Sequence, residues 1–155
     1  MKKVLVTGAT GFIGSYVIVE LLKRGIHVIA SSSNKEKASQ KKWFPQVEFI
    51  ELNFLNIDDT VNYFSYFNKP DILIHLSWEG LPNYLQDFHL TENLPRHQTF
   101  LTNMIRNGLN DLTVTGTCFE YGMIEGCLTE SMEAKPQNPY AQAKDLLRRY
   151  LENLK

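Results

Sequence analysis

The eight residues 7–14, TGATGFIG, constrain the fold of this chain more than any other segment. They follow a short apolar run at residues 4–6 and precede apolar residues at helical spacing, so a strand is expected to turn into a helix here. Side chains at Gly8, Gly11 and Gly14 would block the close approach of a pyrophosphate or of a neighbouring strand. The start of the helix also offers free N–H groups and the positive end of the helix dipole. The segment therefore predicts a dinucleotide-binding site.

The length and composition are those of an ordinary globular chain. It has 155 residues, which is typical of one domain with a sizeable core, and a formal net charge of −1, which favours neither a nucleic-acid nor an anionic-membrane partner. Cys118 and Cys127 form no disulfide framework or zinc pattern, and His89 and His97 have no metal-ligand spacing. No apolar run reaches about 18 residues. We therefore expect a cytoplasmic protein without a membrane span or a metal.

Predicted strands alternate with predicted helices along the chain. The five predicted strands are residues 3–7, 27–30, 47–52, 71–76 and 112–115. Helices are predicted from residue 13 to Gly25, over 57–67, over 90–107 and over 139–154, with a loop or weak helix at 31–40 and long loops at 77–89 and 116–137. This alternation predicts an α/β fold, a doubly wound parallel sheet of strand order 3-2-1-4-5 with helices on both faces. Its ligands are expected beyond the carboxyl ends of the strands.

Tyr140 and Lys144 are four residues apart on the last predicted helix, which Asn138 is expected to cap. Their Cβ atoms would lie about 5–6 Å apart on one face. A nearby ammonium favours the phenolate and lowers the pKa of a tyrosine, so the pair could donate and accept protons near neutral pH. The same spacing is also common on helices that only face solvent.

Thr117 follows the fifth predicted strand, at the edge of the sheet where a ligand is expected. Its hydroxyl could donate a hydrogen bond to a substrate carbonyl. A hydroxyl in such a place also stabilises turns without any ligand.

Four motifs together resemble the extended short-chain dehydrogenase/reductase family, in its branch of nucleotide-sugar epimerases, dehydratases and reductases. They are TGATGFIG at 7–14, DILIHLS at 71–77, TGTCFEYG at 115–122 and YAQAK at 140–144, and they occur in the order of the family. The resemblance covers essentially the whole chain. It implies a Rossmann-type fold, a bound NAD or NADP and a nucleotide-sugar substrate.

The resemblance also implies roles for individual residues. Tyr140 would be the catalytic acid–base, Lys144 would hold the nicotinamide ribose and lower the pKa of Tyr140, and Thr117 would orient the substrate oxygen. The implied reaction is hydride exchange between the nicotinamide and a sugar carbon. The residues expected to bind the cofactor are Gly8, Gly11, Phe12, Ile13, Gly14, Ser32, Asn34, Lys35, Asn53, Phe54, Leu76, Ser77, Trp78, Tyr140 and Lys144.

The residues after Thr117 narrow the kind of reaction. Dehydratases of the family carry an Asp-Glu pair there, whereas this chain has Cys118 and Phe119, which cannot do that acid–base work. Members that epimerise two carbons have a cysteine two residues after the hydroxyl residue, and Cys118 is one residue early. We interpret Cys118 as a packed thiol. A 4-keto reductase or a 4-epimerase remains, and we favour the reductase.

The choice of cofactor depends on the end of the second strand. An acidic residue there normally holds the adenine ribose of NAD, but residues 31–35 contain none. Lys35 and Lys37 could face a 2′-phosphate, or could be ordinary solvated lysines, and we favour NADP over NAD. Asn53 occupies the place of an aspartate beside the adenine, and its amide oxygen could accept a hydrogen bond.

Several other residues near the expected site have structural alternatives. Trp78, Tyr84 and Phe88 could line a sugar pocket or could pack within their own loop. His75, in the fourth strand, is expected to be a buried structural histidine.

Members of the family are about twice as long as this chain. We therefore expect residues 1–155 to be an NAD(P)-binding Rossmann domain without the nucleotide-sugar part, able to bind cofactor with little or no turnover. The helices at 90–107 and 139–154 resemble those that form the dimer interface in the family, so a homodimer is expected. The alternatives are a non-catalytic dinucleotide-binding sensor module and a fragment that folds without binding cofactor.

Overall fold

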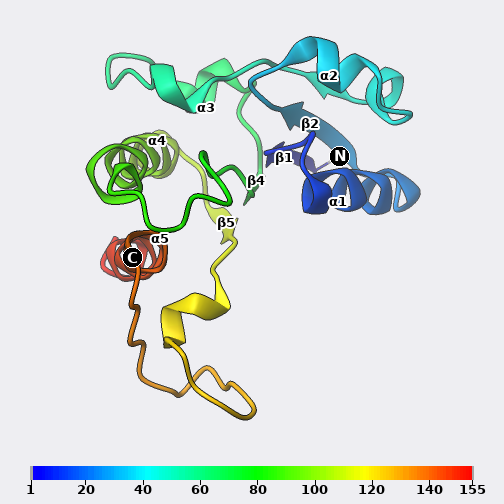
Figure 1. Cartoon of the computed structure of the whole chain (residues 1–155). Coiled ribbons are helices and arrows are strands. Elements are labelled where there is room, and N and C mark those ends of the chain that lie inside the picture. The colour runs from blue at the N-terminus through cyan, green and yellow to red at the C-terminus, as the bar shows by residue number, and fades with distance from the viewer. Residues whose placement is uncertain (1, 155) are drawn as a thin grey trace. The chain divides into compact units, whose positions relative to one another are not determined.

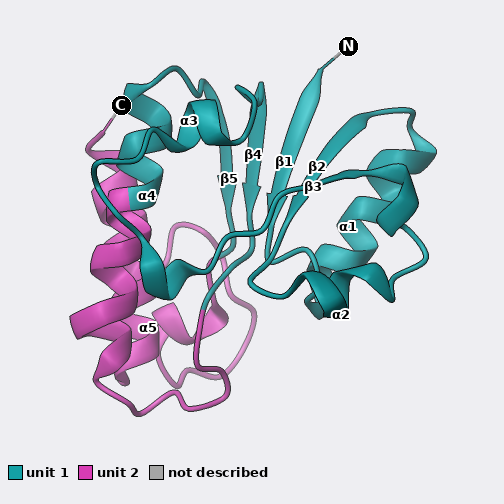
Figure 2. Cartoon of the chain, turned by 90° about the horizontal axis from the view of Figure 1, so that it is seen from above, with its two compact units in different colours: residues 1–78, 100–115 teal, residues 79–99, 116–155 magenta. Residues whose placement is uncertain are grey.

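The computed structural model describes residues 2–154, which fall into two compact units (Figure 2). Unit 1 comprises residues up to 78 together with 100–115, and unit 2 comprises 79–99 together with the residues from 116 onward. The expected single NAD(P)-binding domain stays a prediction.

Unit 1 is built on a five-stranded parallel sheet of order β3-β2-β1-β4-β5, as predicted (Figures 1 and 2). Val6 in the central strand pairs with Ala30 on one side and with Ile74 on the other. The strands are β1 (Lys3–Thr7), β2 (His27–Ser31), β3 (Glu48–Phe49), β4 (Ile72–His75) and β5 (Asp111–Val114).

Side chains on the strands alternate between two buried layers, as they must on a sheet with helices on both faces. On one face, Val4 and Val6 pack in a cluster with Ile18 of α1 (Phe12–Lys23). On the other face, the ring of Phe100 lies 5.6 Å from that of His75. Phe100 belongs to helix α4 (Leu94–Arg106), which begins in unit 2 and ends in unit 1.

The predicted helix over 57–67 is wrong in its first half. The α-helix α3 covers only Tyr63–Tyr66 and begins where the Asn62 side chain accepts a hydrogen bond of 2.9 Å from the N–H of Ser65. Before it, the Asp58 side chain accepts the N–H of Thr60 at 2.8 Å and closes a turn. Local side-chain hydrogen bonds therefore replace a helix that the apolar spacing favoured.

The third strand is shorter than predicted, although the chain keeps its course. β3 has two residues, but the N–H of Ile50 donates to Ala30 at 3.0 Å and that of Leu52 to Ser32 at 3.1 Å. The segment predicted at 47–52 thus still runs beside β2. The remaining short helices of unit 1 are α2 (Lys35–Ser39), η1 (Phe44–Gln46) and η2 (Phe54–Asn56).

Unit 2 contains the end of the loop after β4, the start of the long helix, and the chain beyond β5. The helix predicted at 90–107 is present, but it opens with a π-helical turn, η3 (His89–Asn93), before α4. Pro95 has no N–H to donate, so the regular pattern of hydrogen bonds cannot extend back through it. Within the loop predicted at 116–137 lies one short helix, η4 (Cys118–Tyr121).

The last helix, α5 (Pro139–Glu152), begins as predicted. The Asn138 side chain accepts the N–H of Ala141 at 2.9 Å, and Pro139 occupies the first position, where a missing N–H costs least. Among residues 2–154, no helix combines the length and the apolar character that crossing a membrane requires.

Candidate active site

The glycine turn after β1 is closely packed. Gly8 has a φ of +66°, and a Cβ added to it would lie 2.8 Å from the carbonyl carbon of Leu76, at the end of β4. A Cβ added to Gly14 would lie 2.3 Å from the carbonyl oxygen of Gly8. Side chains at these two positions would therefore push α1 and the β4 end away from the turn. The turn brings the glycine motif next to Leu76 and Ser77, two residues that the sequence analysis expected to bind the cofactor.

The start of helix α1 fits an anionic group. Gly11 is the N-cap residue and no side chain caps the helix there. Phe12 is 81% exposed and Ile13 is also exposed, so neither covers the first turn. Uncapped N–H groups and the positive end of a 12-residue helix suit a pyrophosphate. The residues present thus fit the phosphates of a dinucleotide.

A pocket of about 560 Å³ lies beside the end of β2, still within unit 1. Asn34 and Lys35, both predicted to bind the cofactor, line it together with Glu36, Phe44 and Glu51. Ser32 was also predicted to bind the cofactor, and its hydroxyl donates to the carbonyl of Asn34 at 3.4 Å, beside this pocket. Its size and its polar and charged lining are compatible with a nucleoside.

Two other predicted cofactor residues have structural roles. The side chain of Asn53 accepts the N–H of Leu55 at 3.0 Å and so caps η2. Phe54 is buried, and its ring lies 5.0 Å from Phe100 and 5.4 Å from His75. The Phe54 side chain therefore belongs to the core of unit 1.

The three predicted catalytic residues lie together in unit 2. Thr117 caps η4, and its side chain forms a hydrogen bond with the phenol of Tyr140 in the first turn of α5. Lys144 lies one turn further along the same helix. Tyr140 is 8% exposed and Lys144 is 4% exposed, so both functional groups are largely shielded from water. The sequence thus predicted a real grouping of a hydroxyl, a phenol and an ammonium.

The electrostatics of this group depend mainly on burial. Burial raises the pKa of Tyr140, while the hydrogen bond from Thr117 opposes that rise. Burial also lowers the pKa of Lys144 to about 8. Burial is thus the largest influence on the pKa of both groups, and the lowering of the Tyr140 pKa by Lys144 stays a prediction.

The aromatic residues of the loop after β4 pack on the phenol. The ring of Tyr84 lies 5.4 Å from that of Tyr140 and 5.4 Å from that of Phe119. The ring of Phe88 lies 4.2 Å from that of His89, and the His89 ring lies 5.4 Å from that of Tyr140. Phe88 therefore packs within its own loop, whereas Tyr84 packs on two residues outside it, and a sugar pocket lined by these rings stays a prediction.

Cys118 does not behave as predicted. It is an exposed free cysteine and not a packed thiol, because it occupies the first position of η4, on the solvent side of that turn.

Among residues 2–154, no three side chains of the His, Cys, Asp or Glu type gather to hold a metal ion.

Comparison with known protein families gives a match to this chain. The profile of the NAD dependent epimerase/dehydratase family matches residues 4–155.

The chain belongs to this family.

Curated and solved relatives of the NAD dependent epimerase/dehydratase family agree with this assignment. A dTDP-6-deoxy-L-talose 4-dehydrogenase (NAD(+)) from Aggregatibacter actinomycetemcomitans is 32% identical over 145 residues, which cover 94% of this chain and 52% of the relative. A UDP-glucuronic acid 4-epimerase from Bacillus cereus, solved in complex with NAD, is 25% identical with a TM-score of 0.77 over 97% of this chain and 51% of that chain.

The fold recurs at lower identity. A UDP-glucose-4-epimerase from Stenotrophomonas maltophila, solved with bound NAD, has a TM-score of 0.81 at 21% identity over 99% of this chain and 48% of that chain. This chain spans about half the length of the family members that it matches.

Two buried ionisable residues of unit 2, Glu120 and His97, were not among the site residues expected from the sequence. Glu120 accepts the backbone N–H of Thr117 at 2.8 Å, and its spacing from Thr117 is the ordinary signature of a capping box, which was readable from the sequence. His97 is fully buried and lies 3.1 Å from the carboxylate of Glu79. That pair lacks a sequence signal, because the two residues come from a loop and a helix 18 positions apart.

Proposed function

We propose that this chain is the cofactor-binding and acid–base part of an enzyme that oxidises or reduces C4 of a nucleotide-linked sugar. The observation that carries the proposal is the meeting of Thr117, Tyr140 and Lys144 in unit 2 of a family member whose unit 1 has a glycine turn fit for a dinucleotide. When bound, the nicotinamide would supply the hydride donor or acceptor.

The three residues have complementary tasks in this reaction. In the reducing direction, Tyr140 gives its phenol proton to the carbonyl oxygen, which becomes the new hydroxyl of the sugar. Thr117, already hydrogen-bonded to the phenol, orients that oxygen. Lys144, largely shielded from water, holds the nicotinamide ribose and supplies a positive charge close to the phenolate that forms.

The names of the relatives support C4 as the reacting carbon. The Aggregatibacter relative is named a 4-dehydrogenase, and the Bacillus cereus relative is a 4-epimerase. The dehydrogenase matches with higher identity, and Cys118 and Phe119 stand where dehydratases carry acid–base residues. A 4-keto reductase is therefore favoured over a 4-epimerase.

For the cofactor, the pocket beside β2 supports NAD in place of the NADP that the sequence favoured. A 2′-phosphate there would meet Lys35, but it would also meet the carboxylates of Glu36 and Glu51. Both solved relatives described above hold NAD. The expected homodimer through α4 and α5 is part of the same proposal.

The test is a comparison of NADH with ADP-ribose, which lacks the nicotinamide. Intrinsic fluorescence titrations of the 155-residue chain should show binding of both, with NADH bound more tightly than NADPH. Tyr140→Phe and Lys144→Met should weaken NADH binding and leave ADP-ribose binding unchanged, because the two residues are assigned to the nicotinamide end. Lys35→Met is the matched control at the adenosine end and should weaken both ligands.

Each outcome decides one part of the proposal. If neither NADH nor NADPH binds, the chain is only a fragment that folds without cofactor. If NADPH binds more tightly than NADH, the choice of NAD is overturned. Equal effects of Tyr140→Phe on NADH and ADP-ribose would remove the acid–base assignment and favour a sensor module. The 155 residues alone are expected to show little or no turnover, because they match only about half the length of the relatives.

A further inference from the structure

Glu120 is built into the turn that carries Thr117. Its Oε1 accepts the backbone N–H of Thr117 at 2.8 Å, and the hydroxyl oxygen of Thr117 accepts the N–H of Phe119 at 3.4 Å. These two hydrogen bonds form a reciprocal capping box around η4. They fix both the backbone of Thr117 and the direction of its hydroxyl, the group that meets the phenol of Tyr140.

A capping glutamate is usually a surface residue, but Glu120 is only 6% exposed. Burial raises the pKa of its carboxyl group. The chain also leaves room for this carboxylate, since a Cβ added to Gly116 would lie 3.0 Å from Oε1. The main-chain carbonyl of Glu120 accepts the N–H of Lys135 at 2.8 Å, which ties the long loop to the same turn.

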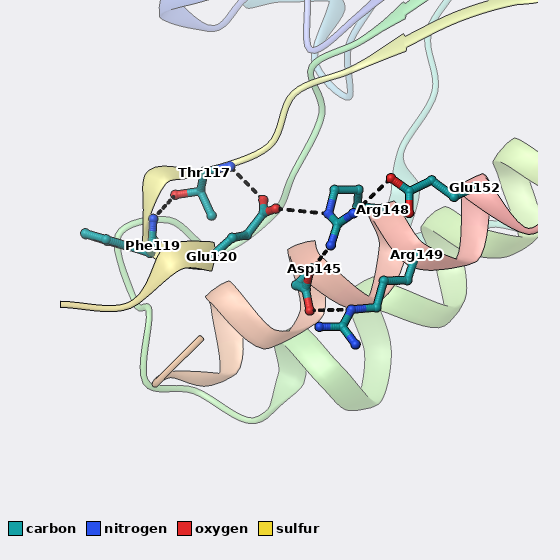
Figure 3. A network of polar contacts seen from close by, with 7 residues as sticks. All are labelled: Thr117, Phe119, Glu120, Asp145, Arg148, Arg149 and Glu152. Atoms are coloured by element: carbon teal, nitrogen blue, oxygen red, sulfur yellow. Dashed lines mark hydrogen bonds and ion pairs between the residues drawn. The ribbon is translucent and has the colours of Figure 1, made fainter. Parts of the chain in front are cut away.

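An ion-pair network joins Glu120 to helix α5 (Figure 3). Its Oε2 lies 3.8 Å from Nε of Arg148. The same guanidinium donates to Asp145 at 2.7 Å and to Glu152 at 2.8 Å. Asp145 also pairs with Arg149 at 2.8 Å. The Thr117 turn is thereby connected to the helix that carries Tyr140 and Lys144.

The carboxylate also acts on both functional groups of that helix. Its negative charge raises the pKa of Lys144 and that of Tyr140. Other ionisable groups that act on this cluster include Asp145 and Arg148 on α5, Cys118 on η4, Tyr84 in the loop after β4, and His97 on α4 with its partner Glu79.

We propose that Glu120 is a positioning residue of the acid–base site, which holds the Thr117 hydroxyl in place and supplies the negative charge that balances the buried ammonium of Lys144. The proposal rests on the function assigned above to Thr117, Tyr140 and Lys144. Glu120 acts through those residues and itself touches neither substrate nor cofactor.

The two tasks can be separated by two substitutions. Glu120→Gln removes the charge but keeps an oxygen that can accept the Thr117 N–H. Glu120→Ala removes both. Glu152→Gln is the matched control, since it removes one carboxylate from the same Arg148 but lies on the exposed side of the network.

Two measurements on the 155-residue chain test the proposal without cofactor or turnover. The first is the pKa of Lys144 by ¹³C NMR of labelled lysine, with its signal assigned by its absence in Lys144→Arg. Glu120→Gln should lower this pKa further below about 8, and Glu152→Gln should leave it unchanged.

The second measurement is hydrogen exchange of the Thr117 amide, which should become about tenfold faster in Glu120→Ala and stay slow in Glu120→Gln.

An unchanged pKa of Lys144 in Glu120→Gln would overturn the proposal and leave Glu120 as a structural cap alone. Unchanged exchange of the Thr117 amide in Glu120→Ala would overturn the positioning task. If Glu120→Ala does not fold, Glu120→Gln still decides the question through the pKa of Lys144. Because neither measurement involves a nucleotide, their failure is distinct from a failure of the NADH and ADP-ribose comparison.

Discussion

The hydroxyl of Thr7 lies 2.8 Å from Nδ1 of His75, and the two residues are register partners in the neighbouring strands β1 and β4. The same hydroxyl oxygen accepts the N–H of Leu76 at 3.2 Å, so the Thr7 side chain is bonded to two groups of β4 and its end. Both residues are buried. The expected structural role of His75 is confirmed, because its imidazole is buried in the core and hydrogen-bonded to the residue that precedes the glycine turn.

We predict that Thr7→Val destabilises the fold by about 1–3 kcal/mol, because it leaves Nδ1 of His75 and the N–H of Leu76 buried without their partner. Urea denaturation measures this change. The control is Thr60→Val, whose hydroxyl donates to Asp58 at 2.7 Å on an exposed turn and which should change stability by no more than about 0.5 kcal/mol. Equal effects of the two variants would contradict the role given to the Thr7 hydroxyl.

Gly14→Ala should disrupt the glycine turn. Its new Cβ would lie 2.3 Å from the carbonyl oxygen of Gly8, so α1 must move away from β1. We expect a loss of stability of about 1–3 kcal/mol, together with weaker NADH binding. The matched variant is Gly25→Ala, which has no atom within 4 Å of the added carbon and a φ of +69°, and so carries only backbone strain of about 1 kcal/mol. Only Gly14→Ala should reduce NADH binding in fluorescence titration.

The burial of Lys144 predicts a rise in stability at high pH. Its pKa is about 8 in the folded chain against 10.5 for the free side chain, so between these values the unfolded chain binds more protons. The cost of burying the ammonium is present in full below pH 8 and is lost as the pH rises toward 10.5. The change amounts to about 3 kcal/mol.

Urea denaturation from pH 7 to pH 10 measures this effect as a difference between the parent and Lys144→Met. The variant should be the more stable at pH 7, and the gap should close as the pH rises. Lys23→Met, at an exposed position of α1, should keep the pH dependence of the parent. A gap between the parent and Lys144→Met that stays constant would show that the ammonium is not buried at a cost.

Much of unit 1 could be predicted because its signals are local. The glycine spacing at 7–14 and the apolar strands 3–7 and 71–76 are short-range patterns, and they were sufficient for the parallel sheet and its order. The helix over 57–67 failed for a local reason as well, since Asn62 and Asp58 bond to nearby N–H groups and the helix begins only at Tyr63. Apolar spacing does not reveal such competition.

The site in unit 2 was predictable in its residues but not in its electrostatics. The spacing of Tyr140 and Lys144 places them on one helix face, but the sign of the pKa shift depends on how completely other elements cover them. The buried carboxylate of Glu120 pairs with Arg148 of helix α5, which is 28 residues further along the chain. A single sequence carries no signal for contacts of that kind.

The buried His97, which pairs with a partly exposed Glu79, predicts a loss of stability in acid. Burial lowers the pKa of His97, and the hydrogen bond to Glu79 opposes this only in part. As the pH falls through about 6.5, the unfolded chain therefore takes up a proton before the folded chain does, and stability decreases. His97→Gln should remove this part of the pH dependence between pH 7 and pH 5, measured by urea denaturation.

His27→Gln is the matched control, because His27 also faces a glutamate, Glu48 at 3.4 Å, but both side chains are partly exposed. If His27→Gln flattened the acid limb as much as His97→Gln, the effect could not be assigned to burial of the imidazole.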